Sequence, residues 1–399
     1  MNRKYSLYLL IFAMVILISI GLVMLASTSA YATDGMAQNY KGLRQQGMWL
    51  GLGIGVCVVM AMIDYHQLKR WFWPIFIGTC VLLALCYVPG IGREINGERR
   101  WIDAGLVGLS WLRFQPSELG KVVTIIAVAF YFDRLAEMNG NLMKNAKPLE
   151  KKFLPGFVYP GVLAAVPALL ILFEKDLGSA ATLFAVVLAM LFIAGSNWFW
   201  LSSVFVAGAG ALAAMVIMIP NRARRFLAIA DLEAFKADEG LQQWRALLAL
   251  GSGGVWGLGL GNGREKMFYM PYAHTDFIFP MIGEELGAIG TLSVVFMFVL
   301  FTVAAFAIAM NAPDRFGMLL GSGIAALIAI EAALNIGVTT ATLPNTGLPL
   351  PFVSYGGSSM LCTLMAVGIL INIYRQGIDP TEPDPKKVTV RRKRVTPRV

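Results

Sequence analysis

The sequence predicts an all-α, polytopic integral membrane protein with ten transmembrane helices and a large extracytoplasmic loop between the seventh and the eighth. Two observations carry this prediction. Of the 399 residues, 57% are hydrophobic and only 14% are charged, and the mean hydropathy is +0.66. Apolar runs long enough to cross a bilayer, which takes about 20 residues, recur from one end of the chain to the other. The first, from Tyr8 to Ala26, lacks the cleavage pattern of a removed leader, so we expect it to be retained.

The apolar segments alternate with polar loops. They cover residues 7–26, 48–63, 72–88, 118–132, 157–173, 177–194, 198–219, 280–310, 316–338 and 359–374. Only Glu174, Lys175 and Asp176 separate the fifth from the sixth, and these residues are too polar for lipid, so we expect a hairpin rather than one long helix. An even number of spans puts both termini on one side. Because that side also carries basic loops and the basic tail, the positive-inside rule assigns it to the cytoplasm.

Two loops on the other side are basic as well. Residues 90–117 contain four arginines, and residues 220–275 contain seven lysines and arginines. Long loops are translocated regardless of their charge, so a solvated basic face is one interpretation. The other is a cationic surface for a polyanionic ligand at the outer leaflet, because guanidinium groups bind phosphate oxygens in bidentate fashion.

We divide the chain into a single membrane domain, residues 1–378, and a basic tail, residues 379–399. The tail has no hydrophobic period and is predicted to be disordered in the cytoplasm, where retention and attraction to anionic membrane lipids would explain it. The four cysteines lie in apolar runs without metal-ligand spacing, which favours small buried hydrophobes. There is no Walker-type loop, which argues against transport driven by an ATPase of its own, and we expect no nucleic-acid partner.

The most informative stretch runs from Gly251 to Gly287. A glycine-rich loop leads into His274, Thr275 and Asp276, which directly precede the eighth apolar segment. An ionisable residue at a membrane surface is costly and is therefore a candidate functional residue. The alternative is structural, because an aspartate at this position can cap the following helix. The residues alone leave these two interpretations evenly balanced.

Two further stretches place polar or irregular backbone among apolar segments. Pro116 can open the fourth helix, and Glu118 and Lys121 then follow three apart on one face, either as a structural ion pair or as part of a site. The stretch LPNTGLPLPFVSYGG, residues 343–357, cannot form a continuous helix because of its prolines. Irregular backbone at membrane depth is tolerated where it is buried in protein or lines a cavity.

Four motifs, NGERRWI, FQPSELGK, the glycine-rich run into HTDFIFPMIGEELG, and TGLPLPFVSYGGSS, resemble in order and spacing the SEDS family (shape, elongation, division and sporulation). The resemblance covers nearly the whole chain, and NGERRW and GLGNGREK are more similar to division-type than to elongation-type members. It implies a peptidoglycan glycosyltransferase that polymerises lipid II at the outer face of the cytoplasmic (inner) membrane during cell division. It also implies a class B penicillin-binding protein as partner, together with other division proteins.

By the same resemblance, the essential acid falls on Asp276 and further family positions fall on residues that we assign to substrate binding. Those substrate-binding residues are Arg100, Trp101, Glu118, Lys121, Asp176, Gln242, Lys266, His274, Thr275 and Ser354. Several positions depart from the family pattern. These are Tyr272 for a glutamate, Lys175 for a proline, Arg245-Ala246 for Gln-Ser, and Ala341 for a glycine.

Glycosyl transfer from a lipid diphosphate needs a base near the acceptor hydroxyl and positive charge near the departing diphosphate. Asp276 can supply the base, and Arg100, Lys121 and Lys266 can supply the charge. No metal site built by the protein is expected; a divalent cation, Mg²⁺ or Mn²⁺, could arrive with the diphosphate.

Three alternatives remain from the sequence. An elongation-type polymerase would use the same residues, and a flippase for lipid-linked precursor would bind the same ligand. A flippase should carry charged residues along a path across the membrane, whereas these polar residues gather at the outer ends of the spans. A scaffold for division proteins would not need the acid at position 276.

Overall fold

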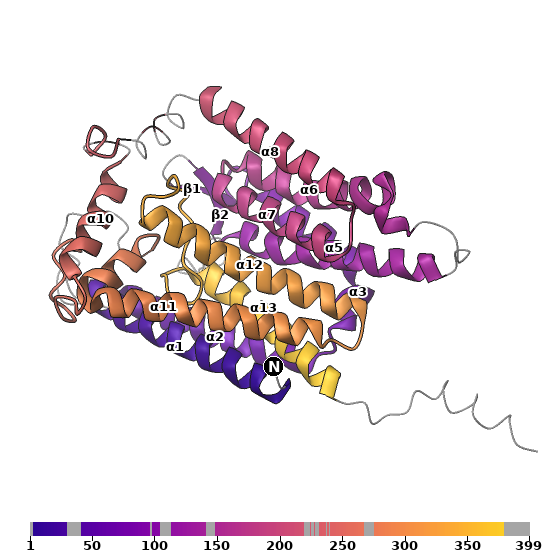
Figure 1. Cartoon of the computed structure of the whole chain (residues 1–399), viewed down its shortest axis with the longest axis horizontal. Helices are drawn as coiled ribbons and strands as arrows, with labels where there is room; N and C mark the ends of the chain where they lie inside the picture. The colour runs from indigo at the N-terminus through magenta and orange to yellow at the C-terminus, as the bar shows by residue number, and fades with distance from the viewer. Residues whose placement is uncertain are drawn as a thin grey trace, which may run out of the picture.

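The computed structural model describes residues 3–29, 41–95, 98–103, 113–140, 148–218, 224, 227, 231–236, 238, 240–266 and 275–378. His274, Tyr272 and the predicted tail, residues 379–399, lie outside the described residues. The chain forms a bundle of long, roughly parallel helices with a small sheet near one end (Figure 1).

Every predicted apolar segment coincides with a helix. These helices are α1 (Arg3–Ser29), α2 (Lys41–Met62), α4 (Phe72–Leu85), α5 (Pro116–Gly140), α6 (Tyr159–Phe173), α7 (Leu177–Ile193), α8 (Trp198–Met218), α11 (Ile278–Met310), α12 (Arg315–Thr339) and α13 (Gly357–Ile378). Shorter elements are α3 (His66–Arg70), α10 (Leu241–Gly253), the 3₁₀ turn η2 (Leu149–Lys151) and the π-helical turn η3 (Leu154–Val158). By length and composition, 6 of the described helices can cross a membrane, and three more are apolar but shorter.

Helix α12 lies at the centre of the bundle and packs against α5, α7, α11 and α13. Around this centre, α1 lies along α11 and α2 lies along α13, while α8 lies at one edge of the bundle (Figure 1). The first described residue of α1 and the last residues of α13 lie at the same end of the bundle (Figure 1). The predicted even number of spans is consistent with this arrangement.

The outer faces of the helices are apolar. On α11, Leu292, Phe296 and Val299 recur at helical spacing and are 66%, 60% and 55% exposed. Val294 and Phe298, on the opposite side of the same helix, are buried. A helix that is apolar on both its packed and its exposed face is typical of a membrane span, where lipid covers the outer side.

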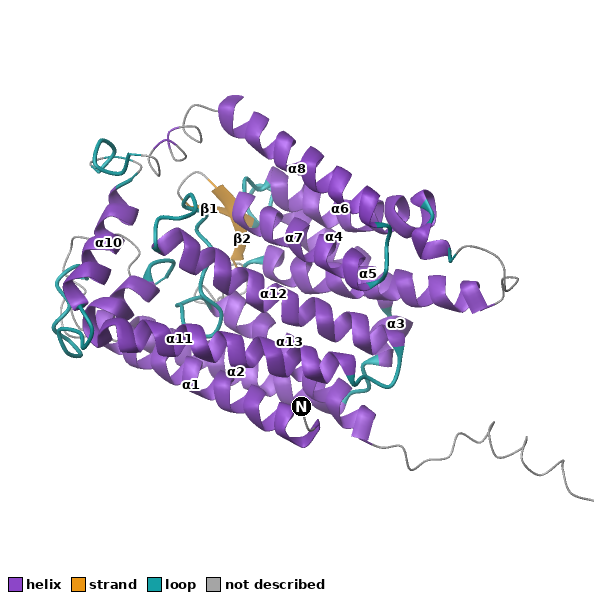
Figure 2. Cartoon of the chain, viewed as in Figure 1, coloured by secondary structure: helices purple, strands orange, loops and turns teal. Residues whose placement is uncertain are grey.

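The prediction of an all-α fold is wrong in the loop between α4 and α5. Strands β1 (Gly92–Ile95), β2 (Glu98–Asp103) and β3 (Arg113–Phe114) form an antiparallel sheet in the order β1-β2-β3 (Figure 2). The sequence carried a signal for it, because Asn96-Gly97, between two runs with β-branched and aromatic residues, is a typical hairpin turn. The structure does not describe residues 96–97.

Candidate functional site

Asp276 lies two residues before the start of α11, beside the last turns of α12, which ends at Thr339. Side chains from distant elements fix its backbone. The Asn335 amide of α12 donates to the Asp276 carbonyl at 2.8 Å and to the Leu348 carbonyl at 2.7 Å. The Ser354 hydroxyl donates to the Thr275 carbonyl at 2.6 Å. The proline-rich loop after α12 is thereby joined to the start of α11.

The structure argues against a purely capping role for Asp276. Phe277 occupies the cap position of α11, and no side chain makes a cap hydrogen bond there. The pKa of Asp276 is raised to about 6, mainly by burial; a hydrogen bond from Thr275 and the charge of Arg100 lower it, and the charge of Asp176 raises it. A carboxylate with this pKa is mostly ionised at neutral pH and is still basic enough to accept a proton.

Arg100 connects the sheet to the tip between α6 and α7. Its guanidinium donates to the Lys175 carbonyl at 2.8 Å and lies 3.6 Å from Asp176 Oδ1, with 13% of its side chain exposed. Asp176 also caps α7, because its Oδ1 accepts from the Ser179 N–H at 3.0 Å, and its Oδ2 accepts from Gln115 at 3.2 Å. The sequence predicted each of these two residues as a substrate-binding residue from its own stretch, and the fold brings them together.

Glu174, at the same tip, was not singled out as a substrate-binding residue. Its side chain is buried, 2% exposed, and neither carboxylate oxygen has a hydrogen-bond partner among the described residues. Burial and the nearby charge of Asp176 raise its pKa to about 8. Glu174 is therefore mainly protonated at neutral pH.

A second ion-pair group lies deeper, between α5 and α12. The Lys121 ammonium donates to Glu118 Oε1 at 2.8 Å and also to Glu331. All three side chains are at most 5% exposed. The predicted Glu118–Lys121 pair is present, and Glu331 is a third member that sequence reasoning missed, because 210 residues separate it from Lys121.

Lys266 has a different environment from the one predicted for a phosphate ligand. Its ammonium donates to Glu285 at 2.6 Å and to Ser27 at 2.6 Å, and both charged side chains are 1% exposed. The described contacts hold Lys266 to α1 and α11 and do not bring it to Arg100 or Asp276. Its assignment to substrate binding stays a prediction.

Two buried glutamates of α11 shape the glycine-rich loop beneath Lys266. Glu284 Oε1 accepts from the Arg264 N–H at 2.7 Å, and Glu285 Oε2 accepts from the Gly261 N–H at 2.9 Å. At Gly287, which has a φ of 69°, a Cβ would lie 2.3 Å from the Val255 carbonyl oxygen. Only glycine fits this close approach of loop and helix.

The remaining predicted positions are less directly connected. Gln242 accepts a hydrogen bond from Asn345 of the proline-rich loop, which fastens α10 to that loop. Trp101 follows Arg100 on β2 and pairs with Arg93 on β1, next to a shift of register between Arg93 and Glu94. Among the described residues, no group of three or more His, Cys, Asp or Glu side chains could hold a metal ion.

A polytopic apolar bundle with a half-buried acid, an arginine–aspartate pair and a proline-rich loop at one end defines a class of membrane protein with a polar site at the membrane surface. The family model described as cell cycle protein, covering FtsW, RodA and SpoVE, matches residues 8–377. The chain belongs to this family, which confirms the resemblance predicted from the motifs.

Relatives and solved structures agree. The chain is 39% identical to the probable peptidoglycan glycosyltransferase FtsW of Geobacter sulfurreducens, over 93% of this chain and 95% of that protein. It is 33% identical to stage V sporulation protein E of Bacillus subtilis, over 92% and 96%.

Two solved structures are similar throughout. One, from a study of structural coordination of polymerization and crosslinking by a peptidoglycan synthase complex, has a TM-score of 0.74 at 26% identity, covering 93% of this chain and 98% of that one. The rod shape determining protein RodA of Thermus thermophilus has a TM-score of 0.65 at 27% identity, covering 92% and 96%.

Proposed function

We propose that this chain is a division-type peptidoglycan glycosyltransferase that polymerises lipid II, with Asp276 as the general base. The observation that carries the proposal is the meeting of Asp276, Arg100 and Asp176 at one end of an apolar bundle. Family membership and the names of the relatives support the enzyme class.

The chemistry follows from the charges of this site. Asp276 accepts the proton of the acceptor sugar hydroxyl as its oxygen attacks the anomeric carbon of the donor. The new glycosidic bond forms as the bond between that carbon and the diphosphate oxygen breaks. Arg100 is a cation whose charge acts on Asp276, and it stabilises the negative charge that develops on the departing diphosphate. Thr275 and Ser354 position the base through the backbone.

A dedicated metal site does not fit the described carboxylates. Asp176 already accepts hydrogen bonds from Ser179 and Gln115, and the described residues around Glu174 do not form a group of three or more His, Cys, Asp or Glu side chains. A Mg²⁺ or Mn²⁺ ion would have to bind mainly through the diphosphate of the substrate. No step of the reaction above is routed through a cation.

The membrane arrangement belongs to the same proposal. With ten spans, both termini lie on the same side of the membrane, which the positive-inside rule assigns to the cytoplasm. The long loop from α8 to α11, which includes α10, then lies on the outer side, so the site faces the outer leaflet. A class B penicillin-binding protein is the expected partner, because a polymerase at that surface needs a transpeptidase to cross-link its strands. The structural similarity to a chain of a peptidoglycan synthase complex that coordinates polymerization and crosslinking supports such a pairing.

Asp276→Asn tests the assignment. The substitution keeps the shape of the side chain and removes the basic carboxylate, so we expect polymer formation from lipid II to fall by about 10²- to 10⁴-fold. The assay uses purified full-length protein, its cognate class B partner and lipid II in detergent. Because detergent offers no two compartments, a flippase would produce no signal, and only polymerisation is measured.

Asp238→Asn is the matched control, because Asp238 lies in the same loop and its side chain is 63% exposed. It should polymerise lipid II at the unmodified rate. Absence of polymer from the unmodified protein with its partner would contradict the enzyme assignment. Full activity of Asp276→Asn would remove Asp276 as the base and leave the enzyme assignment standing.

A further inference from the structure

An open, mostly apolar groove lies at the end of the bundle opposite to Asp276. Its volume is about 450 Å³, within the range of roughly 300–1,000 Å³ that is usual for ligand pockets. The apolar lining comes from α2, the α3–α4 corner and α13, through Met60, Ile63, Leu68, Trp71, Ile75 and Ile369. Helix α12 separates the two ends, since Asp314 caps its first turn and Asn335, in its last turns, donates to the Asp276 carbonyl.

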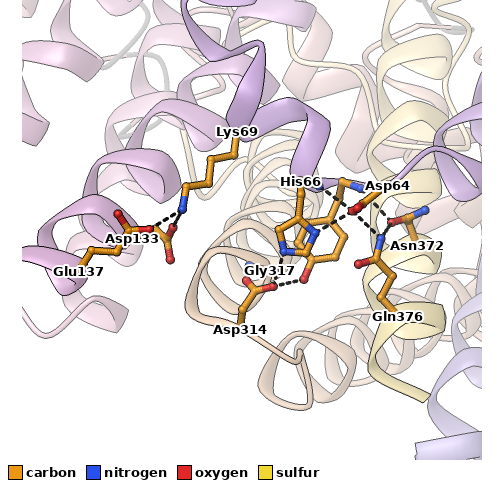
Figure 3. A network of polar contacts seen from close by, with 10 residues as sticks. Asp64, His66, Lys69, Asp133, Glu137, Asp314, Gly317, Asn372 and Gln376 are labelled. Carbon is orange, nitrogen blue, oxygen red and sulfur yellow. Dashed lines mark hydrogen bonds and ion pairs between the residues drawn. The ribbon is translucent and has the colours of Figure 1, made fainter. Parts of the chain in front are cut away.

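A network of polar contacts holds one wall of this groove in place (Figure 3). The Tyr65 N–H donates to Asn372 Oδ1 at 3.1 Å, and the Tyr65 hydroxyl donates to Asp314. Asp64 accepts from the Gln376 amide at 2.6 Å. Asp64 and Tyr65 themselves line the groove, so its shape is fixed by contacts from the α11–α12 turn and from α13.

His66 and Lys69 complete this network without facing a ligand. His66 lies between Asp64 and Asp314, at 2.7 Å and 2.9 Å, and Lys69 is paired with Asp133 and Glu137 of α5 (Figure 3). Hydrogen bonding to Asp314 raises the pKa of His66 to about 9, so His66 stays charged at neutral pH. The short α3 helix is thus anchored on both sides.

Two other cations border the groove. Arg70, which is exposed, directly precedes Trp71. Arg375, also exposed, donates to the Ala61 carbonyl at 2.9 Å, next to Met60. That bond uses one of the five N–H donors of an arginine, which leaves donors for an anion. The indole of Trp71 is 57% exposed, as expected for a tryptophan at the membrane–water interface.

We propose that this groove binds an anionic glycerophospholipid of the cytoplasmic leaflet, with one acyl chain against the apolar lining and its phosphate held by Arg70 and Arg375. The proposed topology of the chain decides only one part of this proposal, namely that the lipid belongs to the cytoplasmic leaflet. Apolar walls suit the acyl chain, and basic residues near a membrane surface attract anionic headgroups. The groove lies far from the reacting groups, so the lipid is a resident ligand and not the substrate.

Titration of delipidated full-length protein in detergent with phosphatidylglycerol or phosphatidylcholine tests the site, with bound lipid counted by native mass spectrometry. We expect tighter binding of phosphatidylglycerol and none of glycerol 3-phosphate, which lacks acyl chains. Arg70→Gln with Arg375→Gln should weaken phosphatidylglycerol binding by about 25-fold, from about fivefold per basic residue. Ile63→Trp should abolish binding of both lipids by filling the groove.

The controls are matched to each change. Lys151→Gln with Lys152→Gln removes two exposed charges predicted to lie on the same membrane face, and Ile77→Trp adds the same bulk at a site that is 57% exposed and outside the groove. Both should bind lipid like the unmodified protein. The proposal would be overturned if a variant and its control lost lipid binding equally, or if the unmodified protein did not prefer phosphatidylglycerol to phosphatidylcholine. Thermal unfolding confirms that each variant is folded.

Discussion

At the scale of single residues, Asp276 has the environment that matters most to the proposed reaction. Its raised pKa of about 6 means that it binds a proton at a pH where an exposed aspartate would be ionised. The base must be deprotonated, so activity is retained above the pKa and lost as the pH falls through it. We expect the initial rate of polymer formation to fall about tenfold per pH unit below about pH 6.

Neighbouring charges make this prediction specific. Arg100 lowers and Asp176 raises the pKa of Asp276. The acid limb of the plot of polymerisation rate against pH should therefore move to higher pH in Arg100→Gln and to lower pH in Asp176→Asn. The shift is measured on the residual activity that each variant keeps. A limb near pH 4 in the unmodified protein, or one that neither substitution moves, would show that another group titrates.

Two departures from the family pattern acquire a physical meaning at this scale. Lys175 has a φ of 63° and Ala341 a φ of 56°, a region that L-residues adopt at a cost of about 1–2 kcal/mol. Proline is locked near −65°, so the family's proline cannot adopt the backbone seen at Lys175. The family's glycine at the position of Ala341 would remove the strain there. Arg245, a third departure, pairs with Glu265 at 3.5 Å.

At the scale of elements, the glycine-rich loop is held by α11 through Glu284 and Glu285. This arrangement predicts that the main effect of Lys266 is to stabilise the folded state. Lys266→Met should leave Glu285 buried without its partner and lower the free energy of unfolding by about 3–5 kcal/mol. Lys266→Met combined with Glu285→Gln should recover part of the loss, because both charges are then gone.

Thermal unfolding of the two single variants and the double variant, compared as a double-mutant cycle, measures this coupling. Exposed Lys236→Met is the control and should have little effect, since Lys236 is 52% exposed. If Lys266→Met keeps its stability but loses affinity for lipid II, the predicted role in substrate binding is the correct one.

At the scale of the whole molecule, the shared end of α1 and α13 and the positive-inside rule together predict cytoplasmic termini and an outer loop between α8 and α11. Single cysteines at Thr381 and Glu233 test this, because the Glu233 side chain is 76% exposed. An impermeant thiol reagent applied to intact cells should label Glu233→Cys and spare Thr381→Cys. The protein without added cysteines is the control, since Cys57, Cys86 and Cys362 are buried. The reverse pattern would invert the topology.

Much of this molecule was determined by its sequence. Apolar periodicity and length located the helices, since burial in lipid or protein requires long apolar runs, and the motifs predicted the family that the comparisons confirm. Asp276, Arg100 and Asp176 were predicted as site residues from their own stretches. Residue 274 and the tail beyond 378 remain predictions, since they lie outside the described residues.

Only the tertiary structure decided which charges meet. Glu331 joins Lys121 across 210 residues, and Lys266 pairs with Glu285. The sheet formed by β1, β2 and β3 carries Arg100 to the α6–α7 tip, and an all-α interpretation with an irregular loop there could not place it. Contacts between distant elements depend on how helices pack, and local propensity and periodicity do not encode that packing.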